Sequence, residues 1–476
     1  MEKHERSGFA WALALLAFST AFMAAAMVSN DPVFASAPAG GTAVAAAPNP
    51  TAVVSVFLDG RHYPASLQTL DLTGRSVTAQ ELLSALPDFP DLRRVELPDS
   101  RFTPEERAAL RAVCPDTVFV WPVTVLGEEH LSTETELSFA GREDLTDASL
   151  EELRAAAAEF YDLHSIDLTG PVLSGAAVHE LDEALGGVEM HATVSLYGVA
   201  VGTDDTEIDL SGVTITDLGA EVENALPWFS QLEKVVMCGC GISDEDMDAL
   251  NRRHDDVRFV WEVYISRAAI RTDADFFITY RASGIKITNR NAGLSALQYC
   301  PDLVALDIGH FHTQDISYVA NMPHLKYLIL AENYVLDLSP LGDLTELKWL
   351  EMFQCVTRDI SPLLGCTALE DLNICYVSCN RDNLYETLRQ MTWLKRLWCS
   401  GTSMTRAQIA SLREELPDCE IWCRTGDEST GSTWRYSESY YEMRDAFHMY
   451  YMDIYGNRTK RLDEEGLQRM HDRFWR

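Results

Sequence analysis

An apolar pattern that returns every 22 residues places the strongest constraint on how this chain can fold. Five six-residue segments, each apolar at its first, fourth and sixth positions, begin at Leu303, Leu325, Leu347, Leu369 and Leu394. Their starts are 22, 22, 22 and 25 residues apart, and two further apolar registers on either side of the segments share the period. Three registers with one period indicate stacked structural repeats.

These repeats resemble the leucine-rich repeat family, particularly its short, internalin-like bacterial type. The best match is LKYLILAENYVLDLSPLGDL, which begins at Leu325 and has Asn333 where the family's asparagine hydrogen-bonds the turning backbone. Cys355 holds the same place in the next repeat, a substitution that the family accepts. The resemblance implies an α/β solenoid over 263–423, with parallel strands on a concave face.

A longer unit repeats upstream, over 53–262. Three nineteen-residue segments with glycine at their fifth and last places begin at Val56, Val123 and Val194. Two of the units also carry a helix-like stretch that ends in a tryptophan, and Thr103 with Glu106 predicts a capping box at the start of one such helix. We interpret the region as three irregular, helix-containing repeats of about 70 residues each. Three small α/β domains in tandem are the alternative.

The N-terminal region predicts export. Residues 1–28 contain an uncharged run from Phe9 to Val28, which is long enough to cross a bilayer core of about 30 Å as a helix. The run also fits a cleaved signal peptide, because small residues suitable for processing follow at Ala35 and Ala37. Residues 29–52 are rich in Ala, Pro and Gly and predict a flexible linker. We therefore expect an extracytoplasmic protein, either secreted or anchored at the cell surface by this segment.

The C-terminal residues 424–476 differ from the repeats, with ten aromatic side chains in 53 residues. A helix is expected to end at Gly456-Asn457, because helical spacing is kept by Tyr440, Met443, Phe447, Tyr450 and Ile454. A second short helix is expected around Leu467 to Phe474. Because a solenoid must cover its exposed apolar edge, we predict a helical cap here. A module that docks a partner is the alternative.

The charge balance limits the partners. The chain has 38 Lys and Arg against 73 Asp and Glu, for a net charge of −35. Such a surface repels phosphate backbones and anionic lipids, so nucleic acid is excluded and a membrane is contacted only through the N-terminal segment, where that is retained. A protein partner with a basic patch is favoured.

Catalytic motifs are absent from the sequence. There is no GxxxxGK[ST], GxSxG or HExxH pattern, so we expect no enzyme activity and no cofactor. The eleven cysteines do not pair into a zinc-site spacing, and several occupy apolar positions of the repeat: Cys300 and Cys366 align with Met322. We interpret them as core residues and expect no metal site.

The concave face is the candidate binding site. In an LxxLxL strand, side chains at positions 3, 5 and 7 point away from the core. Across neighbouring repeats they predict an aromatic patch with a charged rim, and exposed aromatic side chains commonly dominate binding energy. The predicted ligand-binding residues are Tyr327, Trp349, Phe353, Trp398, Asp307, Glu351, Asp371 and Arg396.

Two ligand classes fit such a patch. The family resemblance implies a protein ligand, and a cell-surface or cell-wall glycan is the alternative because flat aromatic faces also bind sugars. A third outcome involves no ligand, since the aromatics can pack across strands and the C-terminal helices can fold over them. If Trp349 is exposed, Trp349→Ala leaves the melting temperature nearly unchanged, whereas Leu350→Ala destabilises the core.

Overall fold

The computed structural model of the chain describes residues 54–265, 268–278, 293–424 and 437–448, and also the backbone of two short strands, β24 (Tyr451–Met452) and β25 (Arg458–Thr459). The predicted signal or anchor segment 1–28, the linker 29–52 and the second C-terminal helix lie outside the described residues.

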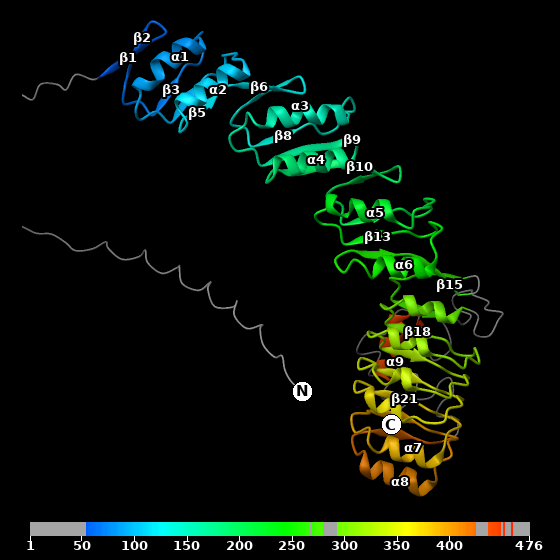
Figure 1. Cartoon of the computed structure of the whole chain (residues 1–476). Coiled ribbons are helices and arrows are strands. Elements are labelled where there is room, and N and C mark those ends of the chain that lie inside the picture. The colour runs from blue at the N-terminus through cyan, green and yellow to red at the C-terminus, as the bar shows by residue number, and fades with distance from the viewer. Residues whose placement is uncertain are drawn as a thin grey trace, which may run out of the picture. The chain divides into compact units, whose positions relative to one another are not determined.

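The short repeats form one seven-stranded parallel sheet (Figure 1). Its strands are β17 (Phe276–Ile278), β18 (Ala305–Asp307), β19 (Tyr327–Ile329), β20 (Trp349–Glu351), β21 (Asp371–Asn373), β22 (Arg396–Trp398) and β23 (Glu420–Trp422). The strands pair without any shift of register, so Leu306, Leu328, Leu350 and Leu372 lie opposite one another in a single row. This row confirms the leucine-rich repeat architecture predicted from the 22-residue period.

In each short repeat, a short 3₁₀ helix or an α-helix lies on the side opposite the strand. The 3₁₀ helices are η4 (Leu294–Tyr299), η5 (Ser317–Asn321), η6 (Ser339–Leu341) and η7 (Ser361–Gly365). The last two described repeats have longer helices in this place, α7 (Arg381–Leu388) and α8 (Arg406–Glu415). Thr405 caps α8 together with Gln408, which satisfies the free N–H groups of the first turn.

Asn333 stabilises the turn after its strand. Its side-chain nitrogen donates to the carbonyl oxygens of Ile308 and Leu330, each at 2.8 Å, and its side-chain oxygen accepts from the Thr313 N–H at 2.8 Å. Cys355 takes the same place one repeat later and donates from its sulfur to the Leu330 carbonyl at 3.0 Å. The roles implied by the family resemblance are therefore confirmed for both residues.

The upstream region contains three smaller sheets. The first pairs β3 (Thr69–Asp71), β4 (Arg94–Glu96) and β5 (Val118–Val120) in parallel. The second has β8 (Glu136–Ser138), β9 (Ser165–Ser174) and β10 (Glu189–Leu196) in parallel, with β11 (Val199–Gly202) antiparallel at its edge. The third pairs β12 (Glu207–Asp209), β13 (Lys234–Val236) and β14 (Arg258–Val260) in parallel.

Helices accompany these three sheets, as the longer repeat unit predicts. They are α1 (Ala79–Ala85), α2 (Pro104–Val113), α3 (Asp147–Ala157), α4 (Gly175–Leu185), α5 (Ala220–Ala225) and α6 (Asp244–Asn251), with one-turn helices η1 (Leu86–Asp88) and η2 (Leu226–Trp228). Thr103 accepts from the Glu106 N–H, and the Glu106 side chain accepts from the Thr103 N–H. The predicted capping box is thus confirmed.

A β-hairpin belongs to each long unit, and its turn explains the repeated glycine. The hairpins at the starts of the three units are β1 (Ser55–Leu58) with β2 (Arg61–Pro64), β6 (Pro122–Val125) with β7 (Glu128–Leu131), and β10 with β11. A further hairpin, β15 (Glu262–Ile265) with β16 (Ala268–Arg271), follows the third unit. Gly60, Gly127 and Gly198 have φ of 70°, 81° and 78°, and the residue before each also has a positive φ. Tight two-residue hairpin turns require this left-handed backbone, which glycine adopts without strain.

One continuous hydrophobic core extends through the described repeats from Val56 to Leu416. The leucines at positions 1, 4 and 6 of the short repeats belong to it, as do Cys300, Cys355, Cys366 and Cys399. No disulfide joins the eleven cysteines, all of which the structure describes. Burial raises the pKa of Cys300, Cys355 and Cys366 to about 12, so these thiols remain protonated and unreactive.

Candidate functional site

The predicted aromatic patch exists, but a helix of the same chain covers it. Tyr327, Trp349 and Trp398 project from the strand face opposite the main core, and there they form a second hydrophobic cluster. Helix α9 (Glu438–Ala446) packs on this face against β20 (Figure 1). α9 confirms only the first part of the predicted C-terminal helix, because it ends at Ala446 and Tyr451–Met452 forms strand β24 instead.

Burial of the aromatic side chains is nearly complete. Trp349 and Trp398 are 0% exposed and Tyr327 is 7% exposed. The Trp349 ring lies 5.5 Å from the Tyr440 ring and 6.4 Å from the Trp398 ring, measured between centroids. Met443 and Phe447 of the α9 segment complete the cluster. The expectation that these aromatics face water is therefore wrong, because α9 removes them from solvent.

Polar contacts join α9 to the sheet at two places, Glu442 within the helix and Ser437 at its N-terminus. At one edge, the Glu442 carboxylate pairs with the Lys348 ammonium group and accepts from the Tyr327 hydroxyl at 3.3 Å. At the N-terminus of the helix, the Ser437 hydroxyl donates to Asp371 Oδ2 at 2.6 Å. Since both groups of contacts join side chains of the sheet to α9, the helix has one defined position.

The charged residues of the predicted rim are engaged within the protein. Arg396 donates from Nε to Asp371 Oδ1 at 2.6 Å and from Nη2 to the Ser439 hydroxyl at 3.2 Å. Asp307 Oδ1 accepts from the Gly309 N–H at 2.9 Å. Burial raises the pKa of both Asp307 and Asp371 to about 6, although the Arg396 guanidinium opposes this shift at Asp371. Both carboxyl groups are buried, so they do not form an exposed acidic rim.

The remaining two predicted residues lie at the margin of the covered face. Glu351 and Phe353 are half-buried, and the Phe353 ring packs edge-on against Tyr376 with centroids 5.8 Å apart. The structure therefore brings the eight predicted residues onto one face of one sheet, but leaves little of that face accessible. The sequence hypothesis of an open aromatic patch on 303–400 is corrected accordingly.

The strand faces of the three upstream sheets remain accessible, and the sequence reasoning missed them. In β3, β8 and β12 the central residue is buried and both neighbours are exposed, whereas the last residues of β5, β13 and β14 (Val120, Val236 and Val260) are buried. Acidic side chains outnumber basic ones at the accessible positions: Asp71, Glu96, Glu136, Asp167, Glu189, Glu207 and Asp209. Basic residues at these positions pair locally, as Lys234 does with Glu207 at 2.9 Å. The sequence pattern that could have identified these strand faces is the alternation of charged and apolar residues in segments such as Glu136–Ser138.

Within the described ranges, no group of three or more His, Cys, Asp or Glu side chains is placed to hold a metal ion. Over the same residues, no helix is both long enough and apolar enough to span a bilayer.

Parallel strands in constant register, a leucine row and a buried asparagine at the turn together define a leucine-rich repeat fold. No protein-family model matches the chain, and neither does any curated protein.

Solved structures of other leucine-rich repeat proteins are similar to the chain. Internalin C2 of Listeria monocytogenes is 12% identical, with a TM-score of 0.25; the match covers 61% of this chain and 80% of that one. An internalin (inlF) of the same organism is 16% identical, with a TM-score of 0.27, covering 77% and 91% of the two chains. The protein LIC12759 of Leptospira interrogans is 14% identical, with a TM-score of 0.25, covering 75% and 90%.

Proposed function

We propose that the chain is an exported, non-enzymatic recognition protein that binds a protein partner through the accessible strand faces of its three upstream sheets. The observation that supports this proposal is a contrast between the three upstream sheets and the seven-stranded sheet. The outward charged side chains of the upstream sheets are accessible and more often acidic than basic, whereas the aromatic side chains on the same face of the seven-stranded sheet lie under α9.

The acidic strand faces favour a partner with a basic patch. Glu136 and Glu189 both pair with Ser165 across their sheet, so the two carboxylates lie on the same rung, two strands apart. Complementary charge of this kind raises the association rate and fixes orientation more than it raises affinity. Binding through these groups should therefore weaken as salt screens them.

The covered aromatic face is not part of the proposed contact surface. Tyr327, Trp349 and Trp398 can meet a partner only where α9 leaves its position, and the described contacts hold it there. The glycan alternative depended on exposed flat aromatic faces at these same residues, and no observation now favours it.

Charge reversal tests the proposed surface. We would compare capture of surface proteins of the source organism by the wild type and by a Glu136→Lys, Glu189→Lys, Glu207→Lys variant. The matched control is Glu105→Lys, Glu151→Lys, Glu245→Lys, which makes the same charge change at exposed positions of α2, α3 and α6. The captured protein would be identified by mass spectrometry, purified and titrated in low and physiological salt.

The strand-face variant should lose binding by about tenfold or more, and the helix-face variant should retain it. Equal loss in both variants would mean that net charge alone attracts the partner, and equal retention would place the contact surface elsewhere. Either result would overturn the proposed surface.

Export is tested at the N-terminus. If the first segment is a signal peptide, the mass of the mature protein should correspond to a chain that begins close to Ser36 or Pro38, after the small residues of the processing region. A full-length protein that fractionates with membranes would indicate a retained anchor. A full-length protein in the soluble cytoplasmic fraction would contradict the export proposal.

A further inference from the structure

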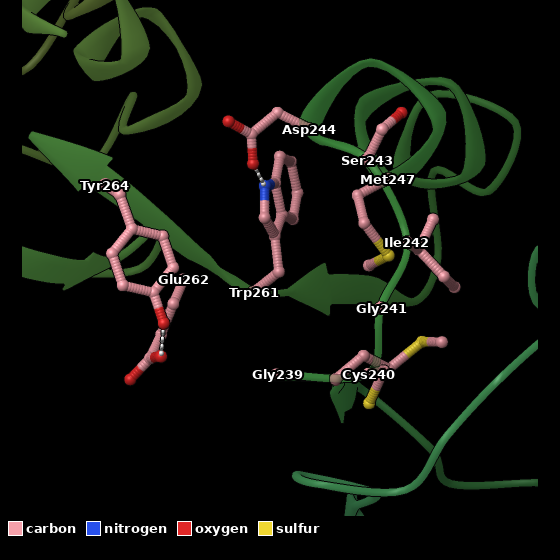
Figure 2. A pocket seen from close by; sticks show the side chains of 11 residues that line it. Gly239, Cys240, Gly241, Ile242, Ser243, Asp244, Met247, Trp261, Glu262 and Tyr264 are labelled. Carbon is pink, nitrogen blue, oxygen red and sulfur yellow. Dashed lines mark hydrogen bonds between the residues drawn. The ribbon is translucent and has the colours of Figure 1, made fainter.

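A cavity lies at the end of the third long unit, beside the β15–β16 hairpin that follows it, and none of the residues that line it was predicted as a site from the sequence. Its volume is about 430 Å³, within the usual range for a small-ligand site. Figure 2 shows Tyr264 and Glu262 on one side, the glycine-containing turn before α6 on the other, and Trp261 between them. The lining residues that matter most are Gly241, Asp244, Met247, Trp261, Glu262 and Tyr264.

The first long unit provides an internal comparison, because its Trp121 is structurally equivalent to Trp261. The backbone N–H of Trp121 donates to the Ser132 hydroxyl at 3.2 Å, and the backbone N–H of Trp261 donates to the Thr272 hydroxyl at 3.2 Å. In both units the tryptophan carbonyl accepts from the backbone N–H of that hydroxyl residue at 2.9 Å. Positions counted back from each tryptophan can therefore be compared directly.

In the first unit, large side chains occupy the place of the cavity. The Arg107 guanidinium lies 5.9 Å from the Trp121 ring centroid and donates to the Pro122 carbonyl at 3.0 Å. Phe102 packs edge-on against the same indole at 6.3 Å. Arg101 extends from the turn to the hairpin, where it donates to Glu129 at 3.1 Å. Arg111 also lies over the Trp121 ring, 5.1 Å from its centroid, so three guanidinium groups belong to this corner of the first unit.

In the third unit, smaller residues stand at the three equivalent positions. Gly241 replaces Arg101, Ile242 replaces Phe102 and Met247 replaces Arg107. A Cβ added at Gly241 would meet no atom within 4 Å, which agrees with open space beside the turn. The cavity is therefore the volume that these larger side chains fill in the first unit.

The third unit has also exchanged uncharged residues for carboxylates. Asp244 stands where the first unit has Pro104, and Glu262 stands where it has Pro122. Asp244 Oδ1 accepts from the Trp261 indole N–H at 3.1 Å, and Glu262 Oε2 accepts from the Tyr264 hydroxyl at 3.2 Å (Figure 2). Neither hydrogen bond neutralises its carboxylate, and none of the described lining residues is a lysine or an arginine.

Among the described residues, the cation nearest in the hairpin pairing does not supply the missing charge. Arg271 is paired with Glu262 across the hairpin, but its guanidinium forms two hydrogen bonds with Asp273, at 2.7 and 2.8 Å. Burial raises the pKa of Asp244, as expected for a carboxyl group that lacks a close positive partner. A cation that entered the cavity would offset this penalty.

We propose that the cavity binds an arginine side chain, whose guanidinium would stack on Tyr264 and pair with Asp244 and Glu262, close to the edge of the buried Trp261 ring. Tyr264 is 56% exposed, so its ring is available for stacking by a guanidinium, and the planar fork of that group suits two carboxylates. The arginine side chain of a bound molecule would thus take the place that the chain's own arginine side chains occupy in the first unit. The biological source of this arginine rests on the proposed function, in which a partner has a basic patch; the chemistry of the pocket does not.

A small probe tests the pocket without any partner. The full chain would be labelled with 5-fluorotryptophan, and the fluorine resonance of Trp261 would be assigned with Trp261→Phe. We expect acetyl-Gly-Arg-Gly-amide to shift this resonance selectively and to saturate at about 1–10 mM, as for a single weakly bound side chain. The same peptide with citrulline, which is isosteric but uncharged, should leave it in place.

Substitutions locate the effect. Glu262→Gln and Asp244→Asn should each weaken peptide binding by about threefold to fivefold, the usual size of a partly exposed ion pair. Met247→Arg, which restores the residue found at Arg107, should abolish it. Glu151→Gln is the matched control: it removes the same charge from an exposed position of α3 away from the cavity, and should change nothing.

Equal shifts with arginine and citrulline peptides, or equal affinities in the Glu151 and Glu262 variants, would overturn the proposal. The other tryptophan resonances report whether each variant is folded. Failure here leaves the strand-face proposal standing, because that proposal is tested by protein capture with a different set of variants. Conversely, loss of capture by the strand-face variant has no bearing on peptide binding at Trp261.

Discussion

Trp349 on β20 and Tyr440 on α9 lie with ring centroids 5.5 Å apart and ring planes inclined by 54°, so the aromatic strand face of the sheet is closed by a helix from the C-terminal region. The contact belongs to a hydrophobic cluster that is separate from the core of the repeats. This arrangement converts a face that the sequence predicts as a binding surface into an intramolecular interface.

Removal of the Tyr440 ring should open this interface. Tyr440→Ala deletes the aromatic contact with Trp349, and we expect α9 docking to weaken by about 2–4 kcal/mol, as for other large-to-small changes at buried positions. Trp349 and Trp398 should then become accessible to acrylamide, with a red-shifted tryptophan emission. Glu438→Ala, at an exposed position of the same helix, should leave both readings unchanged. Unchanged quenching in Tyr440→Ala would mean that α9 does not keep the indoles from water.

Leu350 and Trp349 occupy opposite faces of β20, and both should now contribute to stability. Leu350→Ala should cost about 2–5 kcal/mol because it leaves a cavity in the main core. Trp349→Ala should also destabilise, since its indole is 0% exposed, which reverses the expectation of a nearly unchanged melting temperature. Thermal unfolding of the two variants checks this.

The two substitutions should still differ in kind. Trp349→Ala should release α9, seen as faster proteolysis after Arg444, whereas Leu350→Ala should destabilise the whole array with α9 still in place in the folded molecules. A melting temperature of Trp349→Ala equal to that of the wild type would show that α9 covers the sheet without stabilising it.

The strands of the short repeats could be predicted from sequence because the leucine row is a local, periodic signal. Leu306, Leu328 and Leu350 lie opposite one another as their spacing requires, and Asn333 makes the hydrogen bonds that its position implies. The same alternation correctly placed Trp349 and Trp398 on the face opposite this row. Periodicity therefore predicted the direction of every one of these side chains.

Accessibility could not be predicted in the same way, because it depends on contacts between segments far apart in the chain. The apolar spacing of Tyr440, Met443 and Phe447 predicted a helix but not the surface that it covers. The cavity beside Trp261 was missed for a related reason. It arises from residues that are small, such as Gly241, where the first unit has large ones, and only the equivalence of Trp121 and Trp261 shows what is lacking.

Asn333 should be among the most sensitive polar residues of the short repeats. Asn333→Ala leaves the carbonyl groups of Ile308 and Leu330 and the N–H of Thr313 without the side chain that satisfies them. We expect a loss of about 2–5 kcal/mol, since each buried polar group left unsatisfied costs about 1–3 kcal/mol and such costs are not additive.

Asn333→Cys is the matched comparison, because the chain itself uses cysteine at this place in the next repeat. The thiol can donate to the carbonyl of Ile308, as Cys355 donates to that of Leu330, so this variant should lose less stability than Asn333→Ala. Denaturant unfolding gives both values. If Asn333→Cys and Asn333→Ala were equally unstable, a hydrogen bond to the Ile308 carbonyl would not be what stabilises the turn, and the turn would instead require the size of the asparagine side chain.

The buried Asp307 carboxyl group should make the folded state less stable as pH rises from about 4 to about 6. Burial raises the pKa of its carboxyl group from 3.8 to about 6, while the Gly309 N–H and His310 act in the opposite direction. Below about pH 4 the group is protonated in both the folded and the unfolded chain, and it has no effect. Between pH 4 and 6 the folded protein holds more protons than the unfolded chain, so stability declines, and above pH 6 the full penalty applies.

Asp307→Asn removes this titration while keeping an oxygen for the Gly309 N–H. The variant should match the wild type near pH 4 and be more stable at pH 7.5 by up to about 3 kcal/mol, the free energy of a shift of about two pKa units. The difference between the two melting curves, measured from pH 4 to 8, isolates this group from the other carboxylates. A gap that is constant with pH would show that Asp307 is already ionised in the folded protein at pH 4, and that the Gly309 N–H outweighs its burial.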